Sequence, residues 1–296
     1  KTLADDLWKE MLSHSPIWGT FLGIEVNDGA LDDTSDAARL RDRAMWEKYS
    51  KAAKAIGDEG LDIEWKITRD LIAVGGSIAI EKDDHRMDLL SSVDHMDGVQ
   101  TLLPQIVTFQ DAKTPAKFAK LVSRLKAFPK FMDEAIARVH EAEKRGLVAS
   151  KISTERLIVQ LEGLMAIPTA QSPIVTAANV AGDAERAELV KIVAEYVDPQ
   201  IKRYYEAVSG SYRTKAREVP GLCSAPNGAE LYKVAIRSWT GLQLDPKELH
   251  EIGLQEWADI QEEMKVISTK LGFGGSIEKL RDAAESDPTN VAASKE

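Results

Sequence analysis

The sequence predicts an all-α protein, a multi-helix body with little or no strand. Three observations indicate this class: apolar residues recur three and four positions apart, capping signals start and stop many of these runs, and strand-like alternation is confined to the neighbourhood of Met87 and Leu89. The 296 residues allow one large domain or two smaller ones. Because no repeat or low-complexity linker interrupts the chain, we expect a single α-helical region over 1–296, loosely structured over its tail, 281–296.

The first helices are predicted over residues 3–12, 37–56 and 63–81. Gly75 and Gly76 lie inside the third of these, where a glycine costs about 1 kcal/mol relative to alanine. The pair therefore predicts a kink or a close contact with another helix.

The clearest helix signals lie between Thr114 and Gly146. Thr114 and Pro115 are typical of an N-cap and a first helical position, and the apolar residues that follow lie on one face. A second apolar face runs through 129–145, and Gly146 is a typical C-terminal stop. The same signals predict the remaining helices: 155–165, 184–197, one opened by Asp198 and Pro199, 229–238, and a long one over 245–271.

The long helix contains a His-Glu pair at His250, but its context argues against a zinc site. A zinc-peptidase helix needs His-Glu-x-x-His, because two imidazoles four positions apart share one face. The residue four after His250 is Leu254, and the other His-Glu pair, which starts at His140, has Lys144 at that spacing. No histidine has an acidic residue three positions before it, as a di-iron carboxylate site requires. The sequence therefore predicts no metal site in this chain.

Glu256 lies on the apolar stripe of the same helix, between Ile252 and Ile260. An unpaired carboxylate is costly to bury, so we expect Glu256 to be paired with a cation from another helix or to lie at a cleft.

The composition disfavours two classes of partner. The chain has 48 acidic and 38 basic residues, a net charge of -10, which disfavours binding to nucleic acid or to anionic membranes. No apolar run is long enough to insert into a membrane. The first residues do not form a signal peptide, although a mature start after cleavage would look the same, so the compartment stays open between cytoplasm and periplasm or exterior. The single cysteine, Cys223, excludes an internal disulfide.

Three stretches together resemble a bacterial family, domain of unknown function 885 (DUF885). They are "SPIWGTFLGIEVNDGALDDTS" from Ser15; "DHMDGVQTLLPQI" from Asp94, followed by "SRLKAFPKFMDEAIARVHEAEKRGLV"; and "VPGLCSAPNGAELYKVAIRSWTG" running into "LDPKELHEIGLQEWADIQEEMKVISTKLGFGGS". Their order and spacing cover nearly the whole chain. The family resembles zinc-dependent peptidases, so the resemblance implies a helical hydrolase that acts on peptides.

The resemblance also implies that this chain is the N-terminal half of such a protein. Family members continue further and carry a His-Glu pair followed shortly by Pro-Gly-His, which resembles a zinc site. Here the one Pro-Gly, Pro220-Gly221, is followed by Leu222. Zinc is therefore expected only in a C-terminal half missing from this chain, which would be the main partner of the region described. A smaller departure is Leu231 before Tyr232, where the family often has two tyrosines.

On this hypothesis the chain has no catalytic residue and is inactive alone, and it forms one wall of the substrate cleft. The residues that the resemblance assigns to substrate contact are Asp97, Gln100, Tyr232, His250 and Glu256. Each of the five also fits a purely structural role.

The alternative hypothesis is a non-catalytic helical binding or scaffold protein that recognises a peptide or a protein partner. A groove lined by the five residues would favour the hydrolase. A broad hydrophobic face without convergent polar groups would favour the binding protein.

Overall fold

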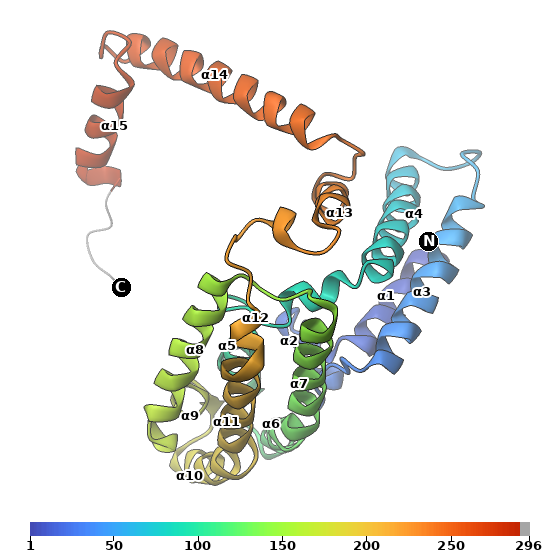
Figure 1. The fold of residues 1–296 in the computed structure, drawn as a ribbon, viewed down its shortest axis with the longest axis vertical. Helices are drawn as coiled ribbons and strands as arrows, with labels where there is room; N and C mark the ends of the chain where they lie inside the picture. Colours follow the sequence, from blue (N-terminus) through green and yellow to red (C-terminus); the bar gives the residue numbers. More distant parts are fainter. Residues whose placement is uncertain (291–296) are drawn as a thin grey trace. The chain divides into compact units, whose positions relative to one another are not determined.

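The computed structural model describes residues 1–290 and confirms the all-α prediction (Figure 1). Contacts divide the chain into two compact units, Lys1–Gly241 and a second that begins at Leu242. The sequence predicted one α-helical region over 1–296, without this boundary. A division by contacts does not test the number of domains, so the single region stays a prediction.

The first unit contains thirteen α-helices among its described elements, together with short 3₁₀ and π turns and two two-residue strands. The longer helices are α1 (Thr2–His14), α3 (Asp36–Lys54), α4 (Ile63–Asp84), α5 (Val99–Phe109), α6 (Pro115–Lys126), α7 (Phe128–Arg145), α8 (Lys151–Ala166), α10 (Asp183–Ile192), α11 (Asp198–Ala207) and α13 (Gly228–Thr240). The shorter helices are α2 (Pro16–Phe21), α9 (Pro173–Thr176) and α12 (Arg213–Lys215). The strands β1 (Asp111–Ala112) and β2 (Asn179–Val180) pair in parallel.

Helices α1, α3 and α4 lie side by side around a small core of their own (Figure 1). Gly76 on α4 allows the close approach of α3, because a Cβ at position 76 would lie 2.7 Å from the Cβ of Ser50. The Ser50 hydroxyl donates to the carbonyl of Ala73 across the same contact, at 2.8 Å. The helix contact predicted from the glycine pair is therefore confirmed at Gly76, whereas Gly75 faces open space.

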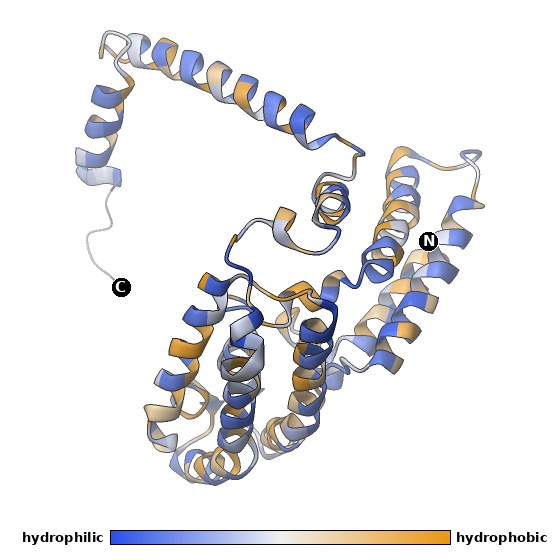
Figure 2. Cartoon of the chain, viewed as in Figure 1, coloured by the Kyte–Doolittle hydropathy of each residue, from blue (hydrophilic) through white to orange (hydrophobic). Residues whose placement is uncertain are grey.

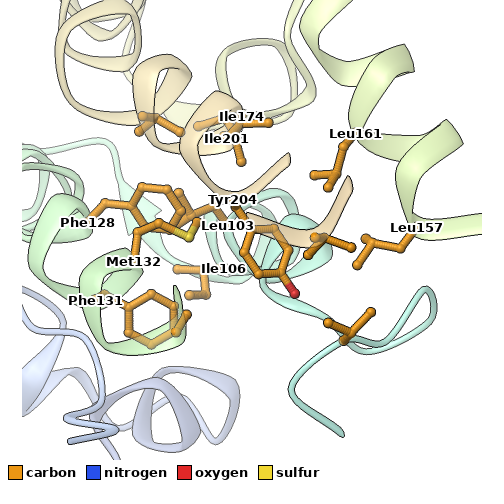
Figure 3. Packing of buried hydrophobic residues seen from close by; sticks show 14 of the residues in the cluster. Leu103, Ile106, Phe128, Phe131, Met132, Leu157, Leu161, Ile174, Ile201 and Tyr204 are labelled. Atoms are coloured by element: carbon orange, nitrogen blue, oxygen red, sulfur yellow. The ribbon is translucent and has the colours of Figure 1, made fainter. Parts of the chain in front are cut away.

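The larger core lies between α5, α6, α7, α8 and the α10–α11 segment. Figure 3 shows side chains from these helices directed toward one another, with Phe128 and Met132 from α7 near Leu103 and Ile106 from α5. Tyr204 of α11 is fully buried among them, and its hydroxyl donates to the carbonyl of Ser92 at 2.9 Å.

The helix ends around α6 and α7 follow the local signals. The hydroxyl of Thr114 accepts a hydrogen bond from the Lys117 N–H, which satisfies one of the free donors of the first turn. Gly146 ends α7 with φ of 70°, in the left-handed region that favours glycine.

A helix begins at Asp198, as Asp198 and Pro199 predicted: α11 covers Asp198–Ala207, and a π turn, Val193–Val197, joins it to the end of α10. A second π turn, Val208–Tyr212, follows α11 and contains a kink at Gly210, whose φ of -80° and ψ of -129° are not helical. Because Pro199 has no N–H, it interrupts the regular hydrogen-bond ladder, and the wider turn before it accommodates that loss.

Residues Met87–Ser91 form a 3₁₀ helix, so the weak strand signal there was wrong. The alternation of Met87 and Leu89 instead reflects burial, since Leu89 is fully buried in the larger core.

One charged side chain, Arg124 of α6, is fully buried in the first unit. Its guanidinium donates to the carbonyl of Ala30 at 2.7 Å, to Gln110 Oε1 at 2.8 Å and to the hydroxyl of Thr20 at 2.8 Å. Burial lowers the pKa of Arg124 to about 10, against the opposing effect of Asp28 and Asp32. This arginine fastens the loop between α2 and α3 to the larger core.

The second unit is built from α14 (Pro246–Lys270) and α15 (Ile277–Ser286), which contact each other. The capping prediction for α14 is confirmed, because the Asp245 side chain accepts from the Lys247 N–H and Pro246 occupies the first turn. Residues 281–286, predicted to be loosely structured, continue α15, and Pro288–Asn290 form a short 3₁₀ turn. The rest of the predicted loose tail, 291–296, lies outside the described residues. Within residues 1–290 no helix is both long and apolar enough to cross a membrane.

Candidate functional site

Gln100 is buried and lines a cavity, whereas the other four predicted site residues are exposed. Gln100 lies in the first turn of α5, just after the turn formed by residues 94–98. Its Nε2 donates to the carbonyl of Asp94 at 3.0 Å and to Gln160 Oε1 of α8 at 3.2 Å. Gln160 in turn donates to the carbonyl of His95 at 2.9 Å. The Gln100 amide therefore ties the 94–98 turn to α8.

Gly98 makes this arrangement possible. A Cβ at position 98 would lie 2.2 Å from both the Asp94 carbonyl oxygen and Gln100 Oε1. The "DGVQ" stretch thus places its glycine and glutamine in one tightly packed turn, while the Asp97 side chain remains exposed.

Tyr232 lies on α13 and is 45% exposed, and the preceding Leu231 is 1% exposed. The two positions at which the family often has tyrosines therefore point to different environments. The departure at Leu231 provides a core residue, and Tyr232 alone remains at the surface.

His250 and Glu256 lie on α14, and both are exposed within the second unit. Ile252 and Ile260, between which Glu256 was expected to be buried, are 44% and 51% exposed. Among the described residues Glu256 has neither an ion-pair partner nor a cavity around it. Within the second unit the apolar stripe of α14 is not covered, so the expectation of a paired or cleft-lining Glu256 stays a prediction. Figure 2 shows hydrophobic positions along α14 between hydrophilic ones.

The cavity that Gln100 lines has a volume of about 340 Å³ and mainly apolar walls. None of the other four predicted residues lines it. Its walls come from α5, from the end of α8 and the segment after it, from α9 and from α11 with the residue before it. The residues are Gln100, Pro104, Leu164, Met165, Ile167, Pro168, Thr169, Ser172, Pro173, Ile174, Val197, Asp198, Ile201 and Lys202.

A second, polar cleft of about 560 Å³ was not predicted from the sequence. It lies between the end of α1, the loop before α3, and the helices α3, α4 and α7. His14 and Asp42 line it, with Nδ1 and Oδ1 2.8 Å apart but without the alignment of a hydrogen bond. Asp32 lies in the same cleft, and burial raises its pKa despite the hydrogen bond that Oδ1 accepts from the Ile17 N–H.

The cations of this cleft are largely neutralised by its own carboxylates. Arg39 and Arg43 each bind one oxygen of Asp83, at 2.5 and 2.8 Å. Burial would raise the pKa of Asp83, but the hydrogen bonds from the two arginines outweigh it and lower that pKa. Arg138 donates to the carbonyl of Asp88 at 2.8 Å. The one signal in the sequence was the "LDDTS" run of the first family-like stretch, which supplies Asp32 and its neighbours.

Neither the cavity nor the cleft is a metal centre. Nowhere in residues 1–290 do three or more histidine, cysteine, aspartate or glutamate side chains converge so as to hold a metal ion. The described part of the chain contains an apolar cavity, a polar cleft and a helix with exposed apolar residues.

Comparisons with known proteins place these features in a family. The crystal structure of a candidate lipoprotein from Colwellia psychrerythraea resembles the chain with a TM-score of 0.81 and 20% identity, over 97% of this chain and 54% of that one. A candidate lipoprotein of unknown function from Shewanella oneidensis has a TM-score of 0.61 and 20% identity, over 91% of this chain and 47% of that one. At this identity the two structures show the fold alone, and this chain spans about half their length. No curated protein matches the sequence.

The sequence profile of DUF885, described as a bacterial protein of unknown function, matches residues 16–296. That match covers nearly the whole chain and does not restrict it to one half of the family, so the assignment to an N-terminal half stays a prediction. It carries no link to zinc or to peptidase chemistry. On this match the chain belongs to the DUF885 family of bacterial proteins.

Proposed function

We propose that this chain is the helical, non-catalytic part of a metallopeptidase-like hydrolase that acts on peptides. In this proposal residues 1–290 form one wall of the substrate cleft, and the zinc ligands belong to polypeptide outside them. The observation that carries it is the uncovered apolar face of α14, the helix that contains the last of the family-like stretches.

The α14 apolar stripe consists of Trp257, Ile260, Met264, Ile267 and Leu271, spaced alternately three and four residues apart. Trp257 is 64% exposed and Leu271 61% exposed, and Ser268 is the one buried residue among the 25 of α14. A helix obtains most of its stability from packing such a face, and contiguous exposed apolar surface marks an interaction site.

The occupant we assign to this stripe is further polypeptide of the same protein. Both solved structures that share the fold are about twice as long as this chain, so a family-length protein has a second half available to pack against it. The sequence resemblance to zinc-dependent peptidases supports a hydrolytic site in that second half. Zinc bound there would supply the Lewis-acid chemistry of peptide hydrolysis, and this chain would hold the substrate against that site.

The same stripe also favours the alternative, a non-catalytic binding protein whose partner is a separate protein. The two proposals differ in what covers α14: the rest of one polypeptide, or another molecule. They also differ in activity, since the alternative has no zinc site in any part of the protein.

The deciding experiment starts with the intact mass of the native polypeptide in its source. If that mass is about twice the 32.6 kDa of this chain, the purified native protein is assayed against a mixture of fluorogenic peptides, with and without a zinc chelator. We expect hydrolysis that the chelator abolishes and added zinc restores. A native chain that ends near Glu296, or a longer one without chelator-sensitive hydrolysis, would overturn the hydrolase and leave the binding protein.

Variants of the longer protein then test α14 itself. Serine at both Trp257 and Ile260 removes the centre of the stripe, and we expect it to lower the thermal midpoint and the activity together. Serine at both Gln255 and Glu262, on the opposite face of the same helix, is the matched control and should leave both unchanged.

A further inference from the structure

We propose that the polar cleft between α1, α3, α4 and α7 binds a small zwitterion, a free amino acid or a dipeptide, with the ligand's ammonium group at Asp32 and its carboxylate at Lys82. Both residues line this cleft, which has a volume of about 560 Å³ and lies wholly within the first unit. The site needs neither zinc nor α14. It therefore goes beyond the proposed function, and its failure would leave that proposal standing.

Asp32 supplies a carboxylate that has no cation of its own. It is partly buried in the loop before α3, and its Oδ1 accepts a hydrogen bond from the Ile17 N–H at 3.0 Å. No lysine, arginine or histidine lies within ion-pair distance of it among residues 1–290. Its other oxygen, Oδ2, makes no hydrogen bond to the described residues and is not enclosed by them, so a ligand can reach it.

The surroundings of Asp32 favour a positively charged group. Burial raises the pKa of Asp32 and the nearby carboxylate of Asp42 adds to this effect, although the hydrogen bond from Ile17 and the charge of Arg124 oppose it. Asp42 also lines the cleft, with Oδ1 2.8 Å from Nδ1 of His14. A ligand ammonium group at Asp32 would offset both the burial of its charge and the repulsion between the two carboxylates.

Lys82 is the cation that the cleft leaves unpaired. It lies on α4, is exposed, and has no carboxylate within ion-pair distance in the part of the chain that the structure describes. The arginines of the cleft differ, because Arg39 and Arg43 both bind Asp83. The third, Arg138, has its Nε 3.9 Å from a carboxylate oxygen. A carboxylate on a ligand therefore has a free cation to bind at Lys82.

The two unpaired charges have opposite signs and belong to separate walls of one cleft. Because Asp32 and Lys82 are too far apart to pair with each other, a ligand that carries both charges can bind each of them. A simple amine would use only the carboxylate, and a simple acid only the lysine. The apolar cavity differs, because Asp198 and Lys202 come from one turn of α11 and the hydroxyl of Thr169 already binds the aspartate.

The rest of the cleft has room for the body of such a ligand. Its volume lies within the roughly 300–1,000 Å³ typical of sites for small molecules. Trp46 and Met87 also line it and offer apolar surface to a ligand side chain. An apolar amino acid such as leucine is therefore a suitable probe.

The test is isothermal titration of this 296-residue chain with leucine and with Leu-Leu, which carry the same two charges at different separations. The N-acetyl derivative of each lacks the ammonium group, and the C-terminal amide of each lacks the carboxylate. We expect the zwitterion with the better spacing to bind at least about tenfold more tightly than either of its derivatives, since a hydrogen bond to a charged group corresponds to about a factor of ten or more.

The outcomes separate the two sources of the ligand and the two contacts. Tighter binding of leucine identifies a free amino acid, and tighter binding of Leu-Leu identifies a dipeptide. Equal affinity for the N-acetyl derivative would overturn the role of Asp32, and equal affinity for the amide would overturn the role of Lys82.

Variants of the chain locate the site. Asp32→Asn keeps Oδ1 as an acceptor and should weaken binding of the zwitterion about tenfold, while binding of the N-acetyl derivative stays unchanged. Lys82→Ala should weaken binding of the zwitterion by a similar factor and leave binding of the amide unchanged. Asp6→Asn and Lys51→Ala, at exposed positions outside the cleft, should change neither. No measurable binding of either zwitterion, or binding that survives both Asp32→Asn and Lys82→Ala, would overturn the proposal.

Discussion

Single buried polar groups decide how the loops of the first unit are held. Arg124 is the strongest case, because its fully buried guanidinium donates hydrogen bonds to the Ala30 carbonyl, to Gln110 and to Thr20. Its planar group reaches acceptors on three segments at once, which a lysine ammonium could not. The loop between α2 and α3, and with it one side of the polar cleft, depends on this residue.

Arg124→Met is expected to destabilise the protein by about 3–5 kcal/mol, because it leaves buried acceptors without a donor. Urea unfolding followed by circular dichroism measures this. Lys126→Met, two residues later on the same helix, is the control and should cost little. A loss below about 1 kcal/mol for Arg124→Met would mean that the loop does not need the arginine.

Two adjacent aspartates should respond to pH in opposite directions. The pKa of Asp32 is raised above its usual 3.8 by burial, and that of Asp33 is lowered below 3.8 by hydrogen bonds from Ser35. The folded state therefore holds the Asp32 proton more tightly than the unfolded state does, so this residue's contribution to stability falls as the pH rises from 3.8 through its raised pKa. The contribution of Asp33 is present above pH 3.8 and is lost as the pH falls through its lowered pKa.

Asparagine at each position removes the titration while Oδ1 remains an acceptor. Relative to the parent chain, Asp32→Asn should gain stability as the pH rises from 3.8 to neutrality. Asp33→Asn should lose stability relative to the parent as the pH rises from the lowered pKa of Asp33 to 3.8. Thermal midpoints measured across this range give both curves, and two curves of the same sign would contradict the assignment.

At the scale of elements, the α3–α4 pair shows how one residue sets the distance between helices. The contact depends on Gly76, whereas Gly75, its neighbour on the same helix, faces open space. The two glycines therefore provide a matched pair of substitutions.

Gly75→Ala should stabilise the protein by about 0.5–1 kcal/mol, because alanine reduces the freedom of the unfolded chain and meets nothing. Gly76→Ala should instead destabilise it by about 1–3 kcal/mol through overpacking against Ser50. Denaturant unfolding of the two variants separates the effects, and equal behaviour would show that α3 and α4 do not rely on this close approach.

The elements also show what the sequence could predict. Caps and stops such as Thr114 and Gly146 act within one turn, so their helices were predicted correctly. Pro199 correctly predicted a helix start at Asp198, but no local signal predicted the π turn, Val193–Val197, that joins this helix directly to α10 while Val193 and Val197 pack in the larger core. Local signals describe a segment, and they do not describe what the rest of the molecule does to it.

The candidate sites show the same difference between local signals, which the sequence contains, and long-range packing, which it does not display. Gln100 was selected from a contiguous stretch, and it proved to be buried at a cavity. The polar cleft brings together His14, Asp32, Asp83 and Arg138 from four separate segments. Because these residues are far apart in the sequence, no motif spacing could predict that they share a cleft. Glu256 shows the converse: the apolar periodicity of α14 is real, but the second unit alone does not cover that face, and the pairing of Glu256 stays a prediction.

At the scale of the whole molecule, stability is distributed unevenly between the two units. The first unit contains both hydrophobic cores, whereas α14 buries one residue in 25. Opening of a segment with few buried contacts costs little free energy, and an isolated helix is marginal in water. In the intact chain, amide hydrogens should therefore exchange slowly in the buried helices of the first unit and fast in α14.

Amides of α14 in the 296-residue chain are expected to exchange with little protection, while those of α7, which buries six residues, exchange only on global unfolding. In a longer native protein, α14 should become protected to a degree that approaches α7, because the stripe from Trp257 to Leu271 is then covered. Mass spectrometry of peptides from both helices measures this, and repeating it over a range of chain concentrations separates self-association from protection within one molecule. Strong protection of α14 in the monomeric 296-residue chain would contradict the uncovered stripe, and with it the observation on which the proposed function rests.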